Sequence, residues 1–99
     1  DILSSSEERS LIQMNYPDII ESDLDKIVKI TAKIRREKEN GKLETHISTR
    51  MVLDFAGLMS DGFSLTDAAE LTIFQLFDPE GGADSERIFV KQLVQKFND

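Results

Sequence analysis

In residues 45–59, THISTRMVLDFAGLM, an extended connector is predicted to end and a helix to begin. The predicted fold depends on this transition. Ser48 is a residue type favoured at helix N-caps, and Ile47 and Val52 have the spacing of a hydrophobic staple. With Ser48 as the cap, Arg50 is the second helical residue and lies over free amides that favour an anion. A cation at an exposed site of this kind lowers helix stability by about 0.3–1 kcal/mol, so the presence of Arg50 at this position needs an explanation.

Two explanations for Arg50 are open. Asp54 lies four residues further along, so the two side chains could form a surface pair worth a few tenths of a kcal/mol in the weaker orientation. In this interpretation Arg50, Asp54, Gly57 and Asp61 form one solvated stripe outside the core. Alternatively, a phosphate reverses the penalty, because the amides, the helix dipole and the guanidinium then act on the same negative charge.

Helices are predicted on the N-terminal side of this stretch. Ser4 with Glu7, and Ser5 with Glu8, have capping-box spacing, which predicts a helix running to about residue 15. The Tyr-Pro-Asp segment at 16–18 ends it, because the residue before a proline is pushed out of the helical region.

A second helix is predicted to start at Ser22 or Asp23 and to end at Asn40-Gly41. Its apolar stripe consists of Leu24, Ile27, Val28, Thr31 and Ile34.

More helices are predicted after the connector. One runs from Thr49 to about Asp61, with Gly62 just past its end, and another from Thr66 or Asp67 to Phe77. The second is apolar on most sides, which predicts a central position. Ser85 begins a last helix whose apolar face contains Phe89, Val90, Leu93, Val94 and Phe97. The pattern predicts an all-α fold, a small bundle of four to five helices forming one domain over residues 1–99, with at most a short extended connector at 42–47.

Composition narrows the possible functions. The chain has 99 residues, 39% of them hydrophobic and 31% charged, with no cysteine and one histidine, His46. These values indicate a globular domain without disulfides, thiolate zinc sites or histidine-rich metal sites. No apolar run approaches the roughly 18 residues of a membrane span, so we expect a cytoplasmic protein. The start at Asp1, without a methionine, suggests a fragment of a longer chain.

The net charge of −7 argues against nucleic-acid binding. The charged residues are unevenly distributed along the chain. Residues 26–42 contain seven basic and two acidic residues, whereas residues 51–86 contain eight acidic residues and no Lys or Arg. The basic cluster has three interpretations, namely a solvated helix end, which we favour, a contact with an acidic partner or adjacent subunit, and a nucleic-acid site. It consists of Lys33, Arg35, Arg36, Lys38 and Lys42.

The sequence gives only weak signals for a calcium site, a catalytic histidine, acid catalysis or an aromatic cofactor pocket. Neither residues 60–62 nor residues 78–86 have the acid spacing of a calcium loop. His46 lacks a plausible triad partner, and the acids at 18, 21, 23 and 25 fit the first turn of a helix. The six phenylalanines have helical spacing and are predicted to lie in the core, namely Phe55, Phe63, Phe74, Phe77, Phe89 and Phe97.

Two longer segments carry a family resemblance, MNYPDIIESDLDKIVKI and HISTRMVLDFAGLMSDGFSLTDAAELT. Residues 12–71, roughly 60 of the 99, resemble the C-terminal helical lid of AAA+ ATPases of the MoxR type. That grouping includes the ATPase subunit of cobalt chelatase and the activators of nitric-oxide reductase and Rubisco. Its lids have a Tyr-Pro segment before a helix and a Ser-Thr-Arg or Ser-Pro-Arg triplet at the start of a later helix, which here is Ser48-Thr49-Arg50.

The resemblance implies a role for each part of the triplet. Arg50 would be the sensor-2 arginine, which reaches the terminal phosphate of ATP, with Ser48 and Thr49 beside it in the cofactor site. It also implies ATP and Mg²⁺ as cofactors of the complete protein. The implied partners are the AAA+ core of the same chain, neighbouring subunits of a ring, and a remodelled substrate or a VWA-type protein, with no nucleic acid and no membrane.

The sequence departs from a complete ATPase. It contains no G-x-x-x-x-G-K-[ST] loop, and Gly81-Gly82 is followed by acids rather than by lysine. We therefore expect no catalytic residue in these 99 residues and no ATP hydrolysis by them alone. The alternative function is a stand-alone acidic helical adaptor that binds a protein partner without nucleotide chemistry.

Overall fold

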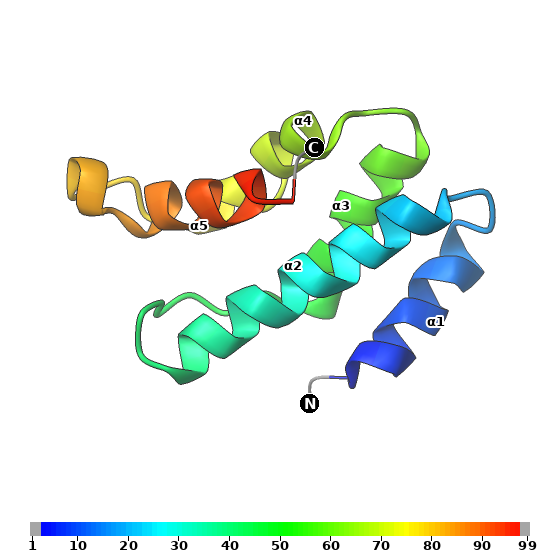
Figure 1. Cartoon of the computed structure of the whole chain (residues 1–99), viewed down its shortest axis with the longest axis horizontal. Coiled ribbons are helices and arrows are strands. Elements are labelled where there is room, and N and C mark those ends of the chain that lie inside the picture. Colours follow the sequence, from blue (N-terminus) through cyan, green and yellow to red (C-terminus); the bar gives the residue numbers. More distant parts are fainter. Residues whose placement is uncertain (1–2, 98–99) are drawn as a thin grey trace.

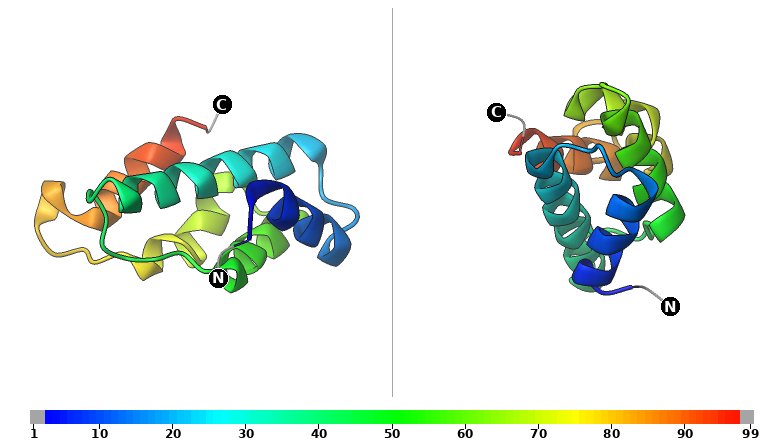
Figure 2. Two further views of the ribbon diagram at one scale, coloured as in Figure 1. Left: turned by 90° about the horizontal axis from the view of Figure 1, so that it is seen from below. Right: turned by 90° about the vertical axis from the view of Figure 1, so that its right-hand side faces the viewer.

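Helix α2 (Glu21–Glu39) is the longest element of the computed structural model, which describes residues 3–97 (Figure 1). Helices α1 (Ser5–Asn15) and α5 (Glu86–Gln95) lie on opposite sides of α2 in this view, and α3 (Thr49–Ser60) passes behind it. The second view in Figure 2 shows α1 beside both α2 and α3. Residues 3–97 contain no strand, which confirms the predicted all-α class.

The remaining elements connect α3 to α5. They are the short helix α4 (Leu65–Leu71) and two 3₁₀ turns, η1 (Phe74–Leu76) and η2 (Gly82–Asp84). Helix α4 packs on α3, and η1 packs on α5. Within the described residues, none of these helices combines the length and the apolar composition needed to cross a membrane.

The capping box at the start of α1 is confirmed for one of the two predicted pairs. The Glu7 amide donates to Ser4 Oγ at 3.2 Å, and the Ser4 amide donates to Glu7 Oε1 at 3.0 Å. The second pair, Ser5 with Glu8, is wrong. Glu8 is buried and binds groups on two other helices, because it lies one turn before the core residue Ile12 and therefore on the inner face of α1.

Glu7 gives the capping box a pH dependence. The hydrogen bond from the Ser4 amide, followed by that from the Ser4 side chain, lowers the pKa of the Glu7 carboxyl below its ordinary value. A lowered folded-state pKa means that the unfolded chain binds the proton first, so this contribution to stability is present at neutral pH and is lost as pH falls through the acid range. We expect the melting temperature to fall less steeply between pH 6 and pH 3 for Glu7→Gln than for the wild type. Parallel curves would contradict the cap's ionic contribution, since both chains share every other carboxyl group.

The start of α2 differs from the prediction. The helix begins at Glu21, one residue before Ser22, and the N-cap is Ile20, whose side chain makes no capping bond. The Ile20 carbonyl accepts the first helical bond, from the Leu24 amide at 3.0 Å, and Glu21 and Asp23 lie in the first turn, where acids suit the helix dipole. The predicted end is confirmed, because Asn40 is the C-cap and Gly41 has the positive φ of 83° that a glycine adopts without strain.

The predicted helix from Thr66 or Asp67 to Phe77 is wrong at both ends. Ser64 accepts from the Asp67 amide at 3.1 Å, so α4 begins at Leu65. It stops at Leu71, where the Thr72 amide donates to the Ala69 carbonyl at 3.3 Å instead of continuing the helical pattern, and the Thr72 hydroxyl donates to the Ala68 carbonyl at 2.7 Å. The chain then turns into η1. The predicted central position holds only in part, since Leu71 is 58% exposed although several neighbours are buried, namely Ala68, Ala69, Ile73, Phe74 and Phe77.

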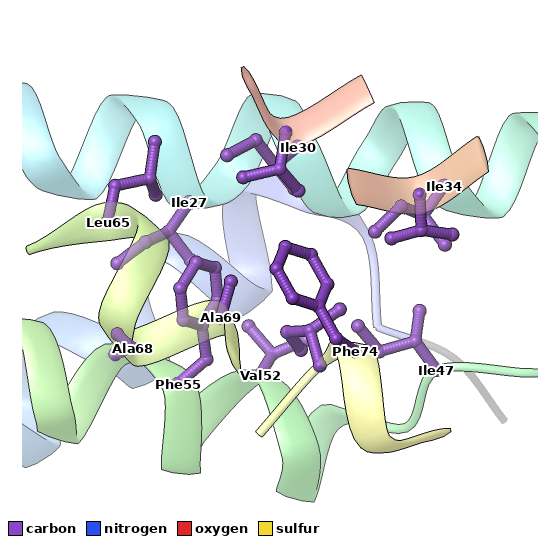
Figure 3. Packing of buried hydrophobic residues seen from close by; sticks show 14 of the residues in the cluster. Ile27, Ile30, Ile34, Ile47, Val52, Phe55, Leu65, Ala68, Ala69 and Phe74 are labelled. Atoms are coloured by element: carbon purple, nitrogen blue, oxygen red, sulfur yellow. The ribbon is translucent and has the colours of Figure 1, made fainter. Parts of the chain in front are cut away.

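The core lies between α2 and the layer formed by α3, α4 and η1. Figure 3 shows Phe55 of α3 and Phe74 of η1 pointing toward the isoleucines of α2. Phe55, Phe74 and Phe77 are buried, and Phe89 and Phe97 pack against the core while partly exposed, as predicted for core aromatics. The prediction is wrong for Phe63, which is 43% exposed in the turn after α3.

Tyr16 fits closely against α3. A Cβ atom placed on Gly57 would lie 2.6 Å from the Tyr16 hydroxyl, so only glycine leaves room for the ring in this position. In the surface-pair interpretation of Arg50, Gly57 lies in a solvated stripe with Arg50 and Asp54. It is instead the contact point between α3 and the turn that follows α1.

The connector and the last helix follow the prediction closely. Residues 43–48 contain neither a helix nor a paired strand, Ser48 has an extended backbone, and Leu43 and Ile47 are buried. The Ser85 hydroxyl accepts from the Ile88 amide at 3.2 Å, which confirms Ser85 as the N-cap of α5.

Candidate functional site at the start of α3

Arg50 lies on the surface at the second position of α3. Ser48 is the N-cap, and its hydroxyl accepts from the Met51 amide at 3.3 Å. The first turn of α3 contains no acidic residue. The Arg50 side chain is exposed, and it has neither a hydrogen bond nor an ion pair with any group in residues 3–97. The explanation by a surface pair with Asp54 therefore fails for the described part of the chain.

Ser48 and Thr49, the other two predicted cofactor residues, are next to Arg50 but have internal partners. The Ser48 hydroxyl caps α3, and the Thr49 hydroxyl donates to Glu8 Oε2 at 3.0 Å. The amides of Thr49 and Arg50 belong to the first turn and have no intrahelical acceptor. Of the predicted triplet, Arg50 is thus the side chain that remains available to a ligand.

A largely buried ion pair contacts this helix start. Arg35 donates from Nη1 to Glu8 Oε1 at 2.7 Å and from Nη2 to Glu8 Oε2 at 2.9 Å. Arg35 also donates to the Ile47 carbonyl, from Nη2 at 3.1 Å and from Nε at 3.3 Å. Glu8 is 2% exposed, and the Arg35 side chain is 16% exposed. The cluster of Glu8, Arg35, Thr49 and the Ile47 carbonyl, called here the α3 anchor, joins α1, α2 and the start of α3.

The α3 anchor was not predicted from the sequence. Arg35 was assigned to a solvated basic cluster, which is wrong for this residue. A signal was present, because Glu8 lies four residues before Ile12 and Arg35 lies four residues after Thr31, so each is a charged residue on the buried face of its helix. The solvated interpretation agrees with the other members of the cluster, which are exposed, namely Lys33, Arg36, Lys38 and Lys42.

Some of the other charged groups form more exposed ion pairs. Arg9 donates to Asp25 at 2.6 Å and lies 3.6 Å from Glu21, which accounts for two of the clustered acids at the start of α2. Lys91 lies 3.6 Å from Glu70 and 5.5 Å from the centre of the Phe74 ring. Residues 3–97 contain no group of three or more His, Asp or Glu side chains arranged to bind a metal ion.

The comparison with known proteins gives a family. Residues 8–88 match the CbbQ/NirQ/NorQ C-terminal family, which is more than half of the chain and includes both Arg50 and the α3 anchor. Neither the curated proteins nor the solved structures give a significant match. A helical fold and a family match over most of the chain lead to one assignment: the chain belongs to the CbbQ/NirQ/NorQ C-terminal family and is the C-terminal region of a MoxR-type AAA+ ATPase.

Proposed function

We propose that this region is the lid of an ATPase that activates or remodels a partner protein, and that Arg50 is its sensor-2 arginine. In this role Arg50 contacts the terminal phosphate of ATP bound by a nucleotide-binding core outside these 99 residues. The observation that carries the proposal is the exposed Arg50 side chain, which has no partner within residues 3–97 and stands at a helix start where a cation is otherwise unfavourable.

The chemistry of this helix start fits a phosphate group. A guanidinium has donors in a planar fork that match phosphate oxygens, and the free amides of the first turn favour the same charge. No acid in the first turn competes for Arg50. ATP bound together with Mg²⁺ would supply the phosphoryl chemistry, while Arg50 would stabilise negative charge on the phosphate and link nucleotide state to lid orientation.

The proposal assigns ATP hydrolysis to the complete protein. A phosphate-binding loop and a magnesium-binding acid would come from the core, because the 99 residues contain no Walker A motif. The proposed partners are that core, neighbouring subunits of a ring, and the protein that is activated or remodelled.

Replacing Arg50 in the complete ATPase tests the proposal. We expect Arg50→Ala to lower kcat for ATP about 10²-fold, the typical effect of removing one preorganised charge-stabilising donor, with little change in melting temperature. Arg36→Ala is the matched control, since Arg36 is also exposed and makes no ion pair within residues 3–97. Unchanged turnover in Arg50→Ala would refute the sensor-2 role. Equal losses in both variants would point to a general effect of net charge.

A further inference from the structure

We propose that Glu8 and Arg35 are positioning residues for Arg50, and that the α3 anchor sets where the Arg50 guanidinium can reach. The inference rests on the proposed function, because it assigns these two residues of the α3 anchor a part in the same phosphate contact. It goes beyond that function because it names a second set of side chains, on α1 and α2. Through these side chains, the packing of the helices determines the position of Arg50.

The contacts of the α3 anchor lie on both sides of the N-cap. Before Ser48, the Ile47 carbonyl accepts from Arg35 at 3.1 and 3.3 Å. After Ser48, the Thr49 hydroxyl donates to Glu8 at 3.0 Å. The backbone is therefore fixed immediately before and immediately after the residue that begins α3, and Arg50 is the next residue along the helix.

Geometry, more than stability, explains why polar groups occupy this site. A pair of well-packed apolar side chains of similar volume is often as stable as a buried ion pair, or more stable. Apolar packing does not fix direction, whereas the fork of Arg35 must meet two oxygens of Glu8 and one carbonyl oxygen at the same time. Lysine could neutralise Glu8 but could not match this planar arrangement.

The α3 anchor also links three helices at one point. Glu8 lies on α1, Arg35 lies in the second half of α2, and Thr49 is the first residue of α3. A shift of α1 relative to α2 would change the Glu8–Arg35 pair and hence the start of α3. Because a misplacement of about 1 Å can reduce a reaction rate 10²-fold, a small shift at the anchor is enough to matter at the phosphate.

A double-mutant cycle in the complete ATPase tests the inference, with kcat, KM for ATP and melting temperature measured for each variant. We expect Glu8→Gln to reduce kcat roughly 10- to 100-fold at a temperature where the domain is folded. In an Arg50→Ala background the same substitution should cause no further loss of kcat, although it should lower the melting temperature equally in both backgrounds. Asp25→Asn is the matched control, because it weakens the Arg9 ion pair between α1 and α2 without touching α3.

Each outcome decides between the two proposals. If Arg50→Ala leaves turnover unchanged, the sensor-2 role fails and the positioning role fails with it. If Arg50→Ala impairs turnover while Glu8→Gln retains the wild-type kcat, the sensor-2 role stands and the positioning role is overturned. A Glu8→Gln loss that is just as large in the Arg50→Ala background also overturns it. Should Glu8→Gln not fold, Arg35→Lys replaces it in the cycle, since it keeps a cation beside Glu8 but not the contact with Ile47.

Discussion

Glu8→Ala is expected to lower the free energy of unfolding by about 3–5 kcal/mol, because it leaves the Arg35 guanidinium largely buried without its counter-ion. Both oxygens of Glu8 accept hydrogen bonds from Arg35, and one also accepts from Thr49, so three donor contacts are lost together. Urea denaturation of the purified 99-residue chain, followed by circular dichroism, measures the change.

A surface ion pair provides the comparison for Glu8→Ala. Glu70 is about half exposed and lies 3.6 Å from Lys91, so Glu70→Ala should lower stability by about 1 kcal/mol or less. Replacing both charges of the buried pair, as Glu8→Leu with Arg35→Met, should be less destabilising than Glu8→Ala alone, because no buried charge is then unpaired. A Glu8→Ala loss no larger than that of Glu70→Ala would show that water reaches Arg35 and compensates it.

Local signals predicted most of the helix ends. Ser4, Ser48 and Ser85 were identified as N-caps because a hydroxyl at that position satisfies an amide three residues further along, which requires no tertiary contact. Asn40-Gly41 was identified as the end of α2 for a similar reason. The start of α2 has no such signal, because its N-cap is Ile20, whose side chain makes no capping bond. At α4 the signal was present in Ser64 but was missed.

The candidate site was predicted only in part. Arg50 stood out because its charge opposes the helix dipole, and this is a property of three adjacent residues. The α3 anchor joins residues that are 27 and 41 positions apart along the chain, so its existence depends on how the helices pack. Glu and Arg are residue types usually found at the surface. Only the positions of Glu8 and Arg35 on the inner faces of their helices distinguish them from the exposed charged residues.

Phe55→Ala is expected to lower the free energy of unfolding by about 3–5 kcal/mol, because it removes a fully buried ring and leaves a cavity that the core fills only in part. Phe55 is on α3 and points into the space beneath α2, where helices from both sides of the core meet (Figure 3). Urea denaturation of the 99-residue chain at constant pH gives the loss from the shift of the midpoint, provided that the slope with urea is unchanged.

The same substitution at Phe63 separates burial from residue type. Phe63 is 43% exposed, so Phe63→Ala removes an identical side chain from the turn after α3 and should change stability by about 1 kcal/mol or less. Equal effects at the two positions would mean that Phe55 is not a core anchor of α3. A large loss at Phe55 alone would show that the apolar face of α3 stabilises the fold, in addition to the polar contacts that Arg35 makes with Ile47 and Glu8 makes with Thr49.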